Sequence, residues 1–165
     1  LVNRDRLQVE LQAAIDRAAA DGGGLALLYI DLDGFKRVND RGGHAVGDRL
    51  LRELAERMQH AVRQNDLVAR VGGDEFVVLL PDCRDAQAAR EVADSLRACI
   101  TAPCRLPEGL FQLDASIGVA TFPADGADAE ALLAHADGVM YAAKHGDRTR
   151  VESGIEGLSA HSKRN

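Results

Sequence analysis

A continuous apolar run, Leu25 to Ile30, leads directly into two acidic residues, Asp31 and Asp33. An apolar run of this length without polar interruption is typical of a strand buried on both faces. The acidic residue and glycines at 21–24 end the helical pattern that comes before it. The sequence therefore predicts a central strand with carboxylates at its C-terminal end.

Hydrophobic periodicity predicts one helix before this run and three helices after it. It also predicts three further strands after the run and a short edge strand at the end. The helices are expected over 7–18, 47–62, 89–100 and 132–143, and the strands over 67–71, 76–80, 111–119 and 149–151. The strand at 111–119 alternates apolar and polar residues, which indicates burial on one face only. Asp128 is a candidate N-cap for the last helix.

The element order favours an α/β (α+β) fold with a single mixed central sheet flanked by helices. Gly72 and Gly73 lie between two of the strands and predict an antiparallel hairpin, because glycine supplies the positive φ that a tight turn needs. The helical crossovers permit parallel neighbours. We expect one domain over 1–152, followed by a polar tail or linker over 153–165.

Composition excludes several classes of protein. The 165 residues are 46% hydrophobic and 28% charged, which suits one globular domain. The net charge of −6 and the 4% aromatic content argue against binding to DNA or RNA, since such modules are basic and use aromatic stacking. No apolar run approaches the ~18 residues of a membrane span, and three scattered cysteines form no disulfide framework. We expect a cytoplasmic location, without direct membrane contact.

Candidate chemistry gathers at the ends of the predicted strands. Asp31 closes the buried strand, whereas Asp74 and Glu75 lie at the hairpin tip. Converging carboxylates make a hard-cation site that suits Mg²⁺. Only three of the 20 basic residues are lysines; Lys36 lies one short turn past Asp31, whereas Lys144 lies four residues before Arg148 at the end of a predicted helix. Carboxylates for a metal and separated cations for phosphates are what phosphoryl or nucleotidyl transfer requires.

The pentapeptide Gly72 to Phe76 reads Gly-Gly-Asp-Glu-Phe and resembles the signature of the GGDEF family, the diguanylate cyclases. Other blocks resemble that family in the same order and spacing, and together they cover about residues 1–151. They are Leu-Val-Asn-Arg at 1–4, Asp-Leu-Asp-Gly-Phe-Lys at 31–36, Asn-Asp at 39–40, Gly-His-Ala-Val-Gly-Asp at 43–48, Ala-Asp at 136–137 and Met-Tyr-Ala-Ala-Lys at 140–144. The fold that the resemblance implies is similar to that of nucleotidyl cyclases and polymerase palm domains.

The resemblance implies a metal site and a catalytic set. Asp31, Asp74 and Glu75 would bind two Mg²⁺ ions per active site, or Mn²⁺ in their place, with the backbone carbonyl of Leu32 as a further ligand. Asp74, Glu75 and Lys36 would be the catalytic residues. The resemblance leaves open which of the two acids is the general base.

The resemblance also implies GTP as the substrate. Asn39 and Asp48 would hydrogen-bond the guanine edge, and His44 would lie near the same nucleotide. The phosphates would be held by Lys36, Lys144 and Arg148, with Gly72 and Gly73 allowing close approach of the backbone. Two GTP molecules would be condensed to cyclic di-GMP with release of two pyrophosphates. Each domain would hold one GTP, so catalysis would need a homodimer.

A regulatory site is implied by Arg63 and Asp66, which lie shortly before Gly72 where the family has an Arg-x-x-Asp inhibitory site. Cyclic di-GMP would then be both the product and an inhibitor. An Arg guanidinium can fork onto phosphate or guanine, and a carboxylate can accept from guanine N–H groups.

The residues also allow blander interpretations. Asp31 alone could be a solvated strand end, Lys144 and Arg148 could complement a helix dipole, and both tyrosines, Tyr29 and Tyr141, are expected in the core. Four histidines are expected to have no catalytic role: His60, His135, His145 and His161.

A second functional hypothesis is a catalytically inactive domain that binds GTP or cyclic di-GMP and controls a fused phosphodiesterase or output domain. The segment 122–126 resembles versions of the family that are fused to a phosphodiesterase. Asp147 and Thr149 depart from the family, which usually has Gly and Asn there. The chain starts inside the family's first motif, so we expect a domain of a larger sensor protein. Where that sensor is attached to a membrane, this domain would belong to its cytoplasmic part.

Overall fold

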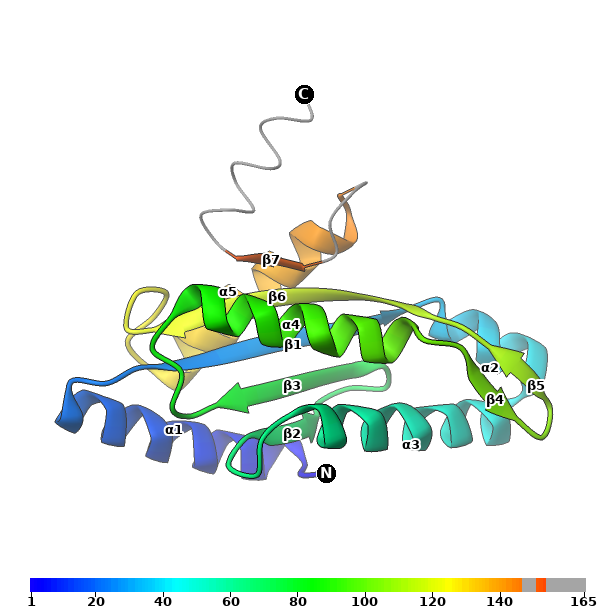
Figure 1. Cartoon of the computed structure of the whole chain (residues 1–165), viewed down its shortest axis with the longest axis horizontal. Helices are drawn as coiled ribbons and strands as arrows, with labels where there is room; N and C mark the ends of the chain where they lie inside the picture. Colours follow the sequence, from blue (N-terminus) through cyan, green and yellow to red (C-terminus); the bar gives the residue numbers. More distant parts are fainter. Residues whose placement is uncertain (147–150, 154–165) are drawn as a thin grey trace.

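Strand β1 (Leu25–Asp33) lies at the centre of a five-stranded sheet in the computed structural model, which describes residues 1–146 and 151–153 (Figure 1). It pairs antiparallel with β3 (Glu75–Leu80) on one side and with β6 (Asp114–Phe122) on the other. Strand β2 (Leu67–Arg70) pairs antiparallel with β3, whereas β7 (Val151–Ser153) pairs parallel with β6. The sheet order is β2-β3-β1-β6-β7, so the predicted mixed central sheet is confirmed.

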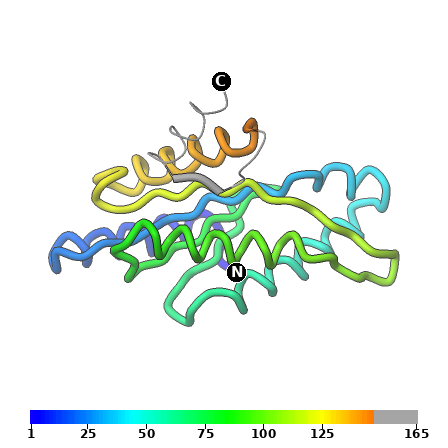
Figure 2. The backbone as a smooth tube through the Cα atoms, turned by 45° about the horizontal axis from the view of Figure 1, so that its top comes forward, coloured from blue at the N-terminus to red at the C-terminus, as the bar shows by residue number. Residues whose placement is uncertain are grey.

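Helices cover both faces of this sheet, and a short hairpin forms a separate two-stranded sheet. These elements are α1 (Arg4–Asp21), α2 (Phe35–Gly42), α3 (His44–Ala61), α4 (Ala86–Thr101), α5 (Ala129–Lys144), β4 (Cys104–Leu106) and β5 (Gly109–Phe111). Both views place α2 and the β4–β5 hairpin at the same end of the molecule (Figures 1 and 2).

Alternate residues of β1 enter two different hydrophobic cores, because successive side chains of a strand point to opposite faces. Leu28 and Ile30 pack with residues of α2, α3 and α4. Leu27 and Tyr29 pack with residues of α1 and α5. The predicted burial of the central strand is thereby confirmed, and Asp31 lies on the same face as Tyr29.

Three helices begin at side chains that cap them. Asn3, Asp85 and Asp128 each accept a hydrogen bond from a backbone N–H in the first turn of α1, α4 and α5 respectively. These bonds satisfy donors that a helix leaves unpaired at its start. The predicted Asp128 cap is confirmed.

The structure corrects the predicted strand at 111–119. Strand β6 spans Asp114–Phe122, and it is buried on both faces rather than one, because α4 and α5 cover it from opposite sides. Ser116 is fully buried, and a Cβ atom at Gly118 would clash with the α5 backbone at Ala136 and Met140. Small residues at these positions allow α5 to approach closely.

Other predictions were incomplete. The sequence pattern did not predict α2 or the separate β4–β5 sheet, and α3 begins at His44 rather than at residue 47. The last strand covers Val151–Ser153, whereas residues 149 and 150 lie outside the described part of the chain. Tyr141 was wrongly expected in the core, since its exposed fraction is 63%; it lies on the outer face of α5.

Candidate active site

The hairpin tip between β2 and β3 is held against the C-terminal end of β1. Asp31 lies directly opposite Glu75 in the β1–β3 pairing, and the Leu32 N–H donates to the Asp74 carbonyl at 3.0 Å. Asp31 is only 5% exposed, an unusual burial for a carboxylate. The acids that the sequence placed in two separate segments therefore meet at one edge of the sheet.

Arginine side chains fix the loop before Glu75. Arg70 donates to the Gly72 carbonyl at 3.1 Å and to the Gly73 carbonyl at 2.8 Å. Arg4 donates to the Val71 carbonyl at 3.1 Å. Neither Gly72 nor Gly73 has a positive φ, so the predicted hairpin is correct but the expected reason for its glycines is wrong. Sequence reasoning missed Arg70 because its partners are backbone carbonyls, which carry no sequence signal.

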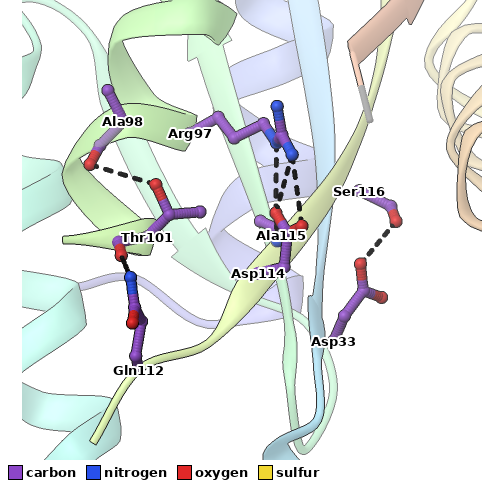
Figure 3. Close-up of polar contacts among 8 residues, drawn as sticks. All are labelled: Asp33, Arg97, Ala98, Thr101, Gln112, Asp114, Ala115 and Ser116. Atoms are coloured by element: carbon purple, nitrogen blue, oxygen red, sulfur yellow. Dashed lines mark hydrogen bonds and ion pairs between the residues drawn. The ribbon is translucent and has the colours of Figure 1, made fainter. Parts of the chain in front are cut away.

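Lys144, in the last turn of α5, forms an ion pair with Asp31 Oδ2. Its Nζ also lies 3.9 Å from Asp33 Oδ1, and the Ser116 hydroxyl donates to Asp33 Oδ2 at 2.9 Å (Figure 3). The hydrogen bond to Asp31 raises the pKa of Lys144. Beyond Tyr29, this face of β1 therefore changes from apolar to polar, with Asp31 and Asp33 as its last two side chains.

Burial sets the protonation behaviour of Asp31. Desolvation raises the pKa of the Asp31 carboxyl, the Lys144 ammonium opposes that effect, and the neighbouring Asp74 carboxylate raises it further. Asp31 and Asp74 therefore lie close enough for their charges to interact. A cation between them would relieve this repulsion.

Glu75 faces a second set of neighbours. The Tyr29 hydroxyl donates to Glu75 Oε1 at 3.3 Å. Burial raises the pKa of Glu75, the Tyr29 hydrogen bond lowers it, and the charges of Asp31, Asp137 and Asp74 raise it. Desolvation and the charge of Glu75 together raise the pKa of Tyr29 to about 12.

The donor set at this edge fits a hard divalent cation. Carboxylate and carbonyl oxygens are the ligands that Mg²⁺ accepts, and Asp31, Asp74 and Leu32 supply them. The Lys144 ammonium already contacts Asp31, so a positive charge is accommodated there. Within residues 1–146 and 151–153, no three His, Cys, Asp or Glu side chains converge into a preformed metal-binding group, so the fit rests on the chemistry of these oxygen atoms and not on a preformed cluster.

The predicted guanine ligands lie on two consecutive helices. Asn39 is half-buried on α2, and its amide packs so closely against Gly47 of α3 that a Cβ there would clash with it. Asp48 is exposed on α3 and lines a hollow of about 280 Å³. That hollow also includes Arg70 and Phe76, next to the signature hairpin.

The remaining predicted nucleotide ligands are either exposed on the surface or outside the residues that the structure describes. Lys36, in the first turn of α2, is exposed, as is His44 at the start of α3. Arg148 lies outside the described residues, together with Asp147 and Thr149. Of the predicted phosphate ligands, Lys144 is therefore the one that the described structure brings to the acids by direct contact.

Arg63 and Asp66 form a tight turn between α3 and β2. The Arg63 N–H donates to Asp66 Oδ2 at 2.9 Å, and the Asp66 N–H donates to the Arg63 carbonyl at 3.0 Å. Burial raises the pKa of Asp66, whereas the hydrogen bond from Arg63 lowers it. The bond from the Arg63 backbone leaves its exposed guanidinium available for other partners.

This turn borders a hollow of about 750 Å³ lined by residues of the α3–β2 loop, the end of β3 and α4. Leu80, at the far end of β3 from Glu75, is part of its lining. Five residue steps along a strand span about 17 Å. The hollow is thus separated from the acidic edge by the length of β3.

Comparison with known proteins identifies the family. A model described as "Diguanylate cyclase, GGDEF domain" matches residues 1–150, and the chain belongs to this family. No helix in the parts that the structure describes is long and apolar enough to cross a bilayer.

Curated relatives extend well beyond this chain. The bifunctional diguanylate cyclase/cyclic di-GMP phosphodiesterase MucR of Pseudomonas aeruginosa is 44% identical over 144 residues, which are 87% of this chain and 21% of MucR. The diguanylate cyclase TpbB of the same species is 42% identical over 145 residues, which are 87% of this chain and 33% of TpbB. The chain therefore spans about a fifth to a third of these relatives.

Solved structures share the fold. The GGDEF domain of TpbB from Pseudomonas aeruginosa matches with a TM-score of 0.90 and 40% identity, covering 93% of this chain and 96% of that one. The GGDEF domain of DgcB from Caulobacter crescentus, solved in complex with c-di-GMP, matches with a TM-score of 0.83 and 28% identity, covering 93% and 91%.

Proposed function

We propose that this chain is the catalytic domain of a diguanylate cyclase, which condenses two GTP molecules into cyclic di-GMP and releases two pyrophosphates. The observation that carries the proposal is the meeting of Asp31, the Asp74–Glu75 hairpin tip and Lys144 at one edge of the sheet. Membership of the family supports the same activity. We take the domain as residues 1–152, with 153–165 as a tail or linker.

Two Mg²⁺ ions, or Mn²⁺ ions, would be held by the carboxylates of Asp31, Asp74 and Glu75 and the carbonyl of Leu32. Bound there, they would offset the negative charge of the phosphates in a chain that itself carries a net charge of −6. The Lys144 ammonium, which contacts Asp31 in this structure, would then be released to a phosphate oxygen. Lys36 and Arg148 would bind the same triphosphate.

The guanine would bind between α2 and α3. Asn39 supplies an amide and Asp48 a carboxylate, and together they match the donors and acceptors of the guanine edge. His44 lies at the start of the same helix as Asp48 and would flank the nucleotide. Gly47 supports this arrangement, because the absence of a side chain there leaves room for the Asn39 amide.

In the reaction, the 3′-oxygen of one GTP would form a bond to the α-phosphorus of the other. The bond from that phosphorus to the bridging oxygen of the β-phosphate breaks, and pyrophosphate leaves. The hydroxyl proton passes to a base, for which Asp74 and Glu75 are the candidates. Repeating the step in the opposite direction closes the ring, so two copies of the domain must face each other as a homodimer.

Feedback by the product is the regulatory part of the proposal. Cyclic di-GMP would bind at Arg63 and Asp66, in the hollow of about 750 Å³ beside them. The Arg63 guanidinium would fork onto a phosphate or a guanine, and Asp66 would accept from guanine N–H groups. The DgcB domain crystallised with c-di-GMP supports this class of ligand for this chain.

A second candidate is a regulatory domain without turnover, which would use the same hollow to bind cyclic di-GMP and control an attached phosphodiesterase or output domain. The similarity to bifunctional MucR supports it. We place either kind of protein in the cytoplasm, alone or as the cytoplasmic part of a sensor.

One experiment separates the two functions. Concentrated protein is incubated with GTP and Mg²⁺, and the products are separated by chromatography. We expect cyclic di-GMP and pyrophosphate in a ratio of one to two, and no product from ATP. Binding of cyclic di-GMP without any turnover would contradict the cyclase and favour the regulatory domain.

A further inference from the structure

Tyr29 is a core residue with an additional polar contact. It lies on β1 two positions before Asp31, on the face of the sheet that α1 and α5 cover, and it is 7% exposed. Its ring packs in that core, where phenylalanine would serve equally well. The hydroxyl, however, reaches the hairpin and donates to Glu75 Oε1 at 3.3 Å.

Glu75 needs such a restraint because its surroundings repel it. The carboxylates of Asp31, Asp137 and Asp74 all act on Glu75 with the same sign of charge. Among the residues that the structure describes, Tyr29 is the one side chain that donates a hydrogen bond to Glu75. A carboxylate surrounded by like charges moves away from them unless a donor holds it.

There is also somewhere for Glu75 to move. A hollow of about 120 Å³ lies beside Tyr29 and Val71 and is bordered by Arg4 and Asp137. The Arg4 guanidinium donates to the Val71 carbonyl and carries a positive charge that would attract a released carboxylate. The Tyr29 hydroxyl, which itself borders this hollow, opposes that displacement through its hydrogen bond to Glu75.

We propose that Tyr29 is a positioning residue, whose hydroxyl holds the Glu75 carboxylate near Asp31 and Asp74, so that it would join them as a ligand when a divalent cation binds. The inference rests on the proposed function, in which Glu75 is a metal ligand. Partners that orient a metal ligand without touching the metal typically change metal affinity by about 10- to 100-fold when they are removed.

The test is a double-mutant cycle in the full chain, with Mn²⁺ affinity measured by electron paramagnetic resonance in the presence of a non-hydrolysable GTP analogue. The variants are Tyr29→Phe, Glu75→Ala and the pair. We expect Tyr29→Phe to weaken Mn²⁺ binding about tenfold or more. In the Glu75→Ala background, the same substitution should change nothing further, because the hydroxyl has lost the group through which it acts.

Tyr141→Phe is the matched control, since it removes the hydroxyl of the only other tyrosine, which is 63% exposed on α5. Its Mn²⁺ affinity should equal that of the unsubstituted protein. Unchanged affinity in Tyr29→Phe, equal losses in both backgrounds, or no Mn²⁺ binding by the unsubstituted protein would each overturn the inference. Failure of the proposed function is distinct: the cycle would behave as expected, yet GTP would give no cyclic di-GMP.

Discussion

Lys144 and Asp31 form an ion pair that joins the last turn of α5 to the buried end of β1, across 113 positions of sequence. Burial makes this pair consequential. Removing the lysine would leave a carboxylate that is 5% exposed without its cation, whereas removing the carboxylate would leave a partly exposed ammonium that water can solvate. If a metal cation and a phosphate bound here, Asp31 would pair with the cation and Lys144 with the phosphate.

Asp74→Ala should abolish conversion of GTP while the domain remains folded. Asp74 is half-buried at the hairpin tip, and its carboxylate lies close enough to Asp31 to raise the pKa of that group. Loss of a charged ligand from the metal site should reduce turnover by roughly a hundredfold or more. Turnover is measured by cyclic di-GMP formation and folding by circular dichroism. Asp94→Asn, exposed on α4, is the control, and an Asp74→Ala protein with normal turnover would refute the metal site.

Asp48→Ala should weaken GTP binding without affecting the affinity for the metal. A guanine N–H pair left without an acceptor in a closed site costs about 1–3 kcal/mol, or about 5- to 150-fold in the dissociation constant. Calorimetry with a non-hydrolysable GTP analogue measures the change. Glu56→Ala, exposed on the same helix, should bind normally. Equal affinity of the unsubstituted domain for the ATP and GTP analogues would show that the guanine assignment is wrong.

Arg63→Ala should remove product inhibition and leave the initial rate close to normal. The Arg63 turn lies at the far end of β3 from Glu75, so cyclic di-GMP bound there need not compete with GTP. Inhibition requires that the ligand binds a separated arrangement of the two domains better than the productive one. Progress curves with added cyclic di-GMP, together with calorimetry, measure both effects. Arg105→Ala, exposed on β4, is the control; absence of cyclic di-GMP binding to the unsubstituted domain would refute the site.

Glu75→Gln should flatten the dependence of stability on pH in the metal-free domain. Burial raises the pKa of Glu75 above its ordinary value of 4.5, so the folded state binds this proton more tightly than the unfolded state. Its contribution to the free energy of unfolding is therefore present below that ordinary value and is lost as pH rises through the raised pKa. Urea unfolding at about pH 4.5 and about pH 7 measures the difference. Identical pH slopes for the two proteins would contradict this interpretation.

Gly118→Ala should destabilise the domain by about 1–3 kcal/mol, because the added methyl group would overlap the backbone of α5. Gly138→Ala is a matched control within α5 itself, where a Cβ meets no neighbouring atom within 4 Å. That substitution should stabilise the helix by about 0.5–1 kcal/mol. Urea midpoints rank the three proteins, and a Gly118→Ala protein as stable as the unsubstituted one would show that α5 can shift without cost.

Periodicity and apolar runs were sufficient to predict the central strand and the four longer helices, because each of these presents a continuous apolar stripe. They were insufficient for α2, whose buried residues are only Phe35 and Val38 and which is bounded by glycines at 34 and 43. Ser116 looked like a solvent-facing residue because polarity alone does not reveal that helices cover both faces of β6. Burial of a small polar side chain depends on the layers around the sheet.

The residues of the candidate site also divide into those that the sequence could predict and those that it could not. Asp31, Asp74 and Glu75 could be predicted to converge, since strand ends and hairpin tips meet at sheet edges. Lys144 was placed near them only by resemblance, because no local pattern links residues that are 113 positions apart. The contacts of Arg70 and Tyr29 were missed for a physical reason: Arg70 contacts two backbone carbonyls and Tyr29 a carboxylate distant in sequence, and such contacts leave no mark on spacing or composition.

Because Gly118 has no side chain, the backbone of α5 contacts the sheet closely at this position. The helix backbone rests on the sheet between Ala136 and Met140, and Lys144 is one turn further on, about 6 Å along the axis from Met140. A tilt of about 10° around this point would move the backbone of Lys144 by about 1 Å, whereas the opposite end of the helix would sweep through a larger arc. The absence of a Cβ at Gly118 therefore helps to set how far Lys144 reaches toward Asp31, because a side chain there would push α5 away from the sheet.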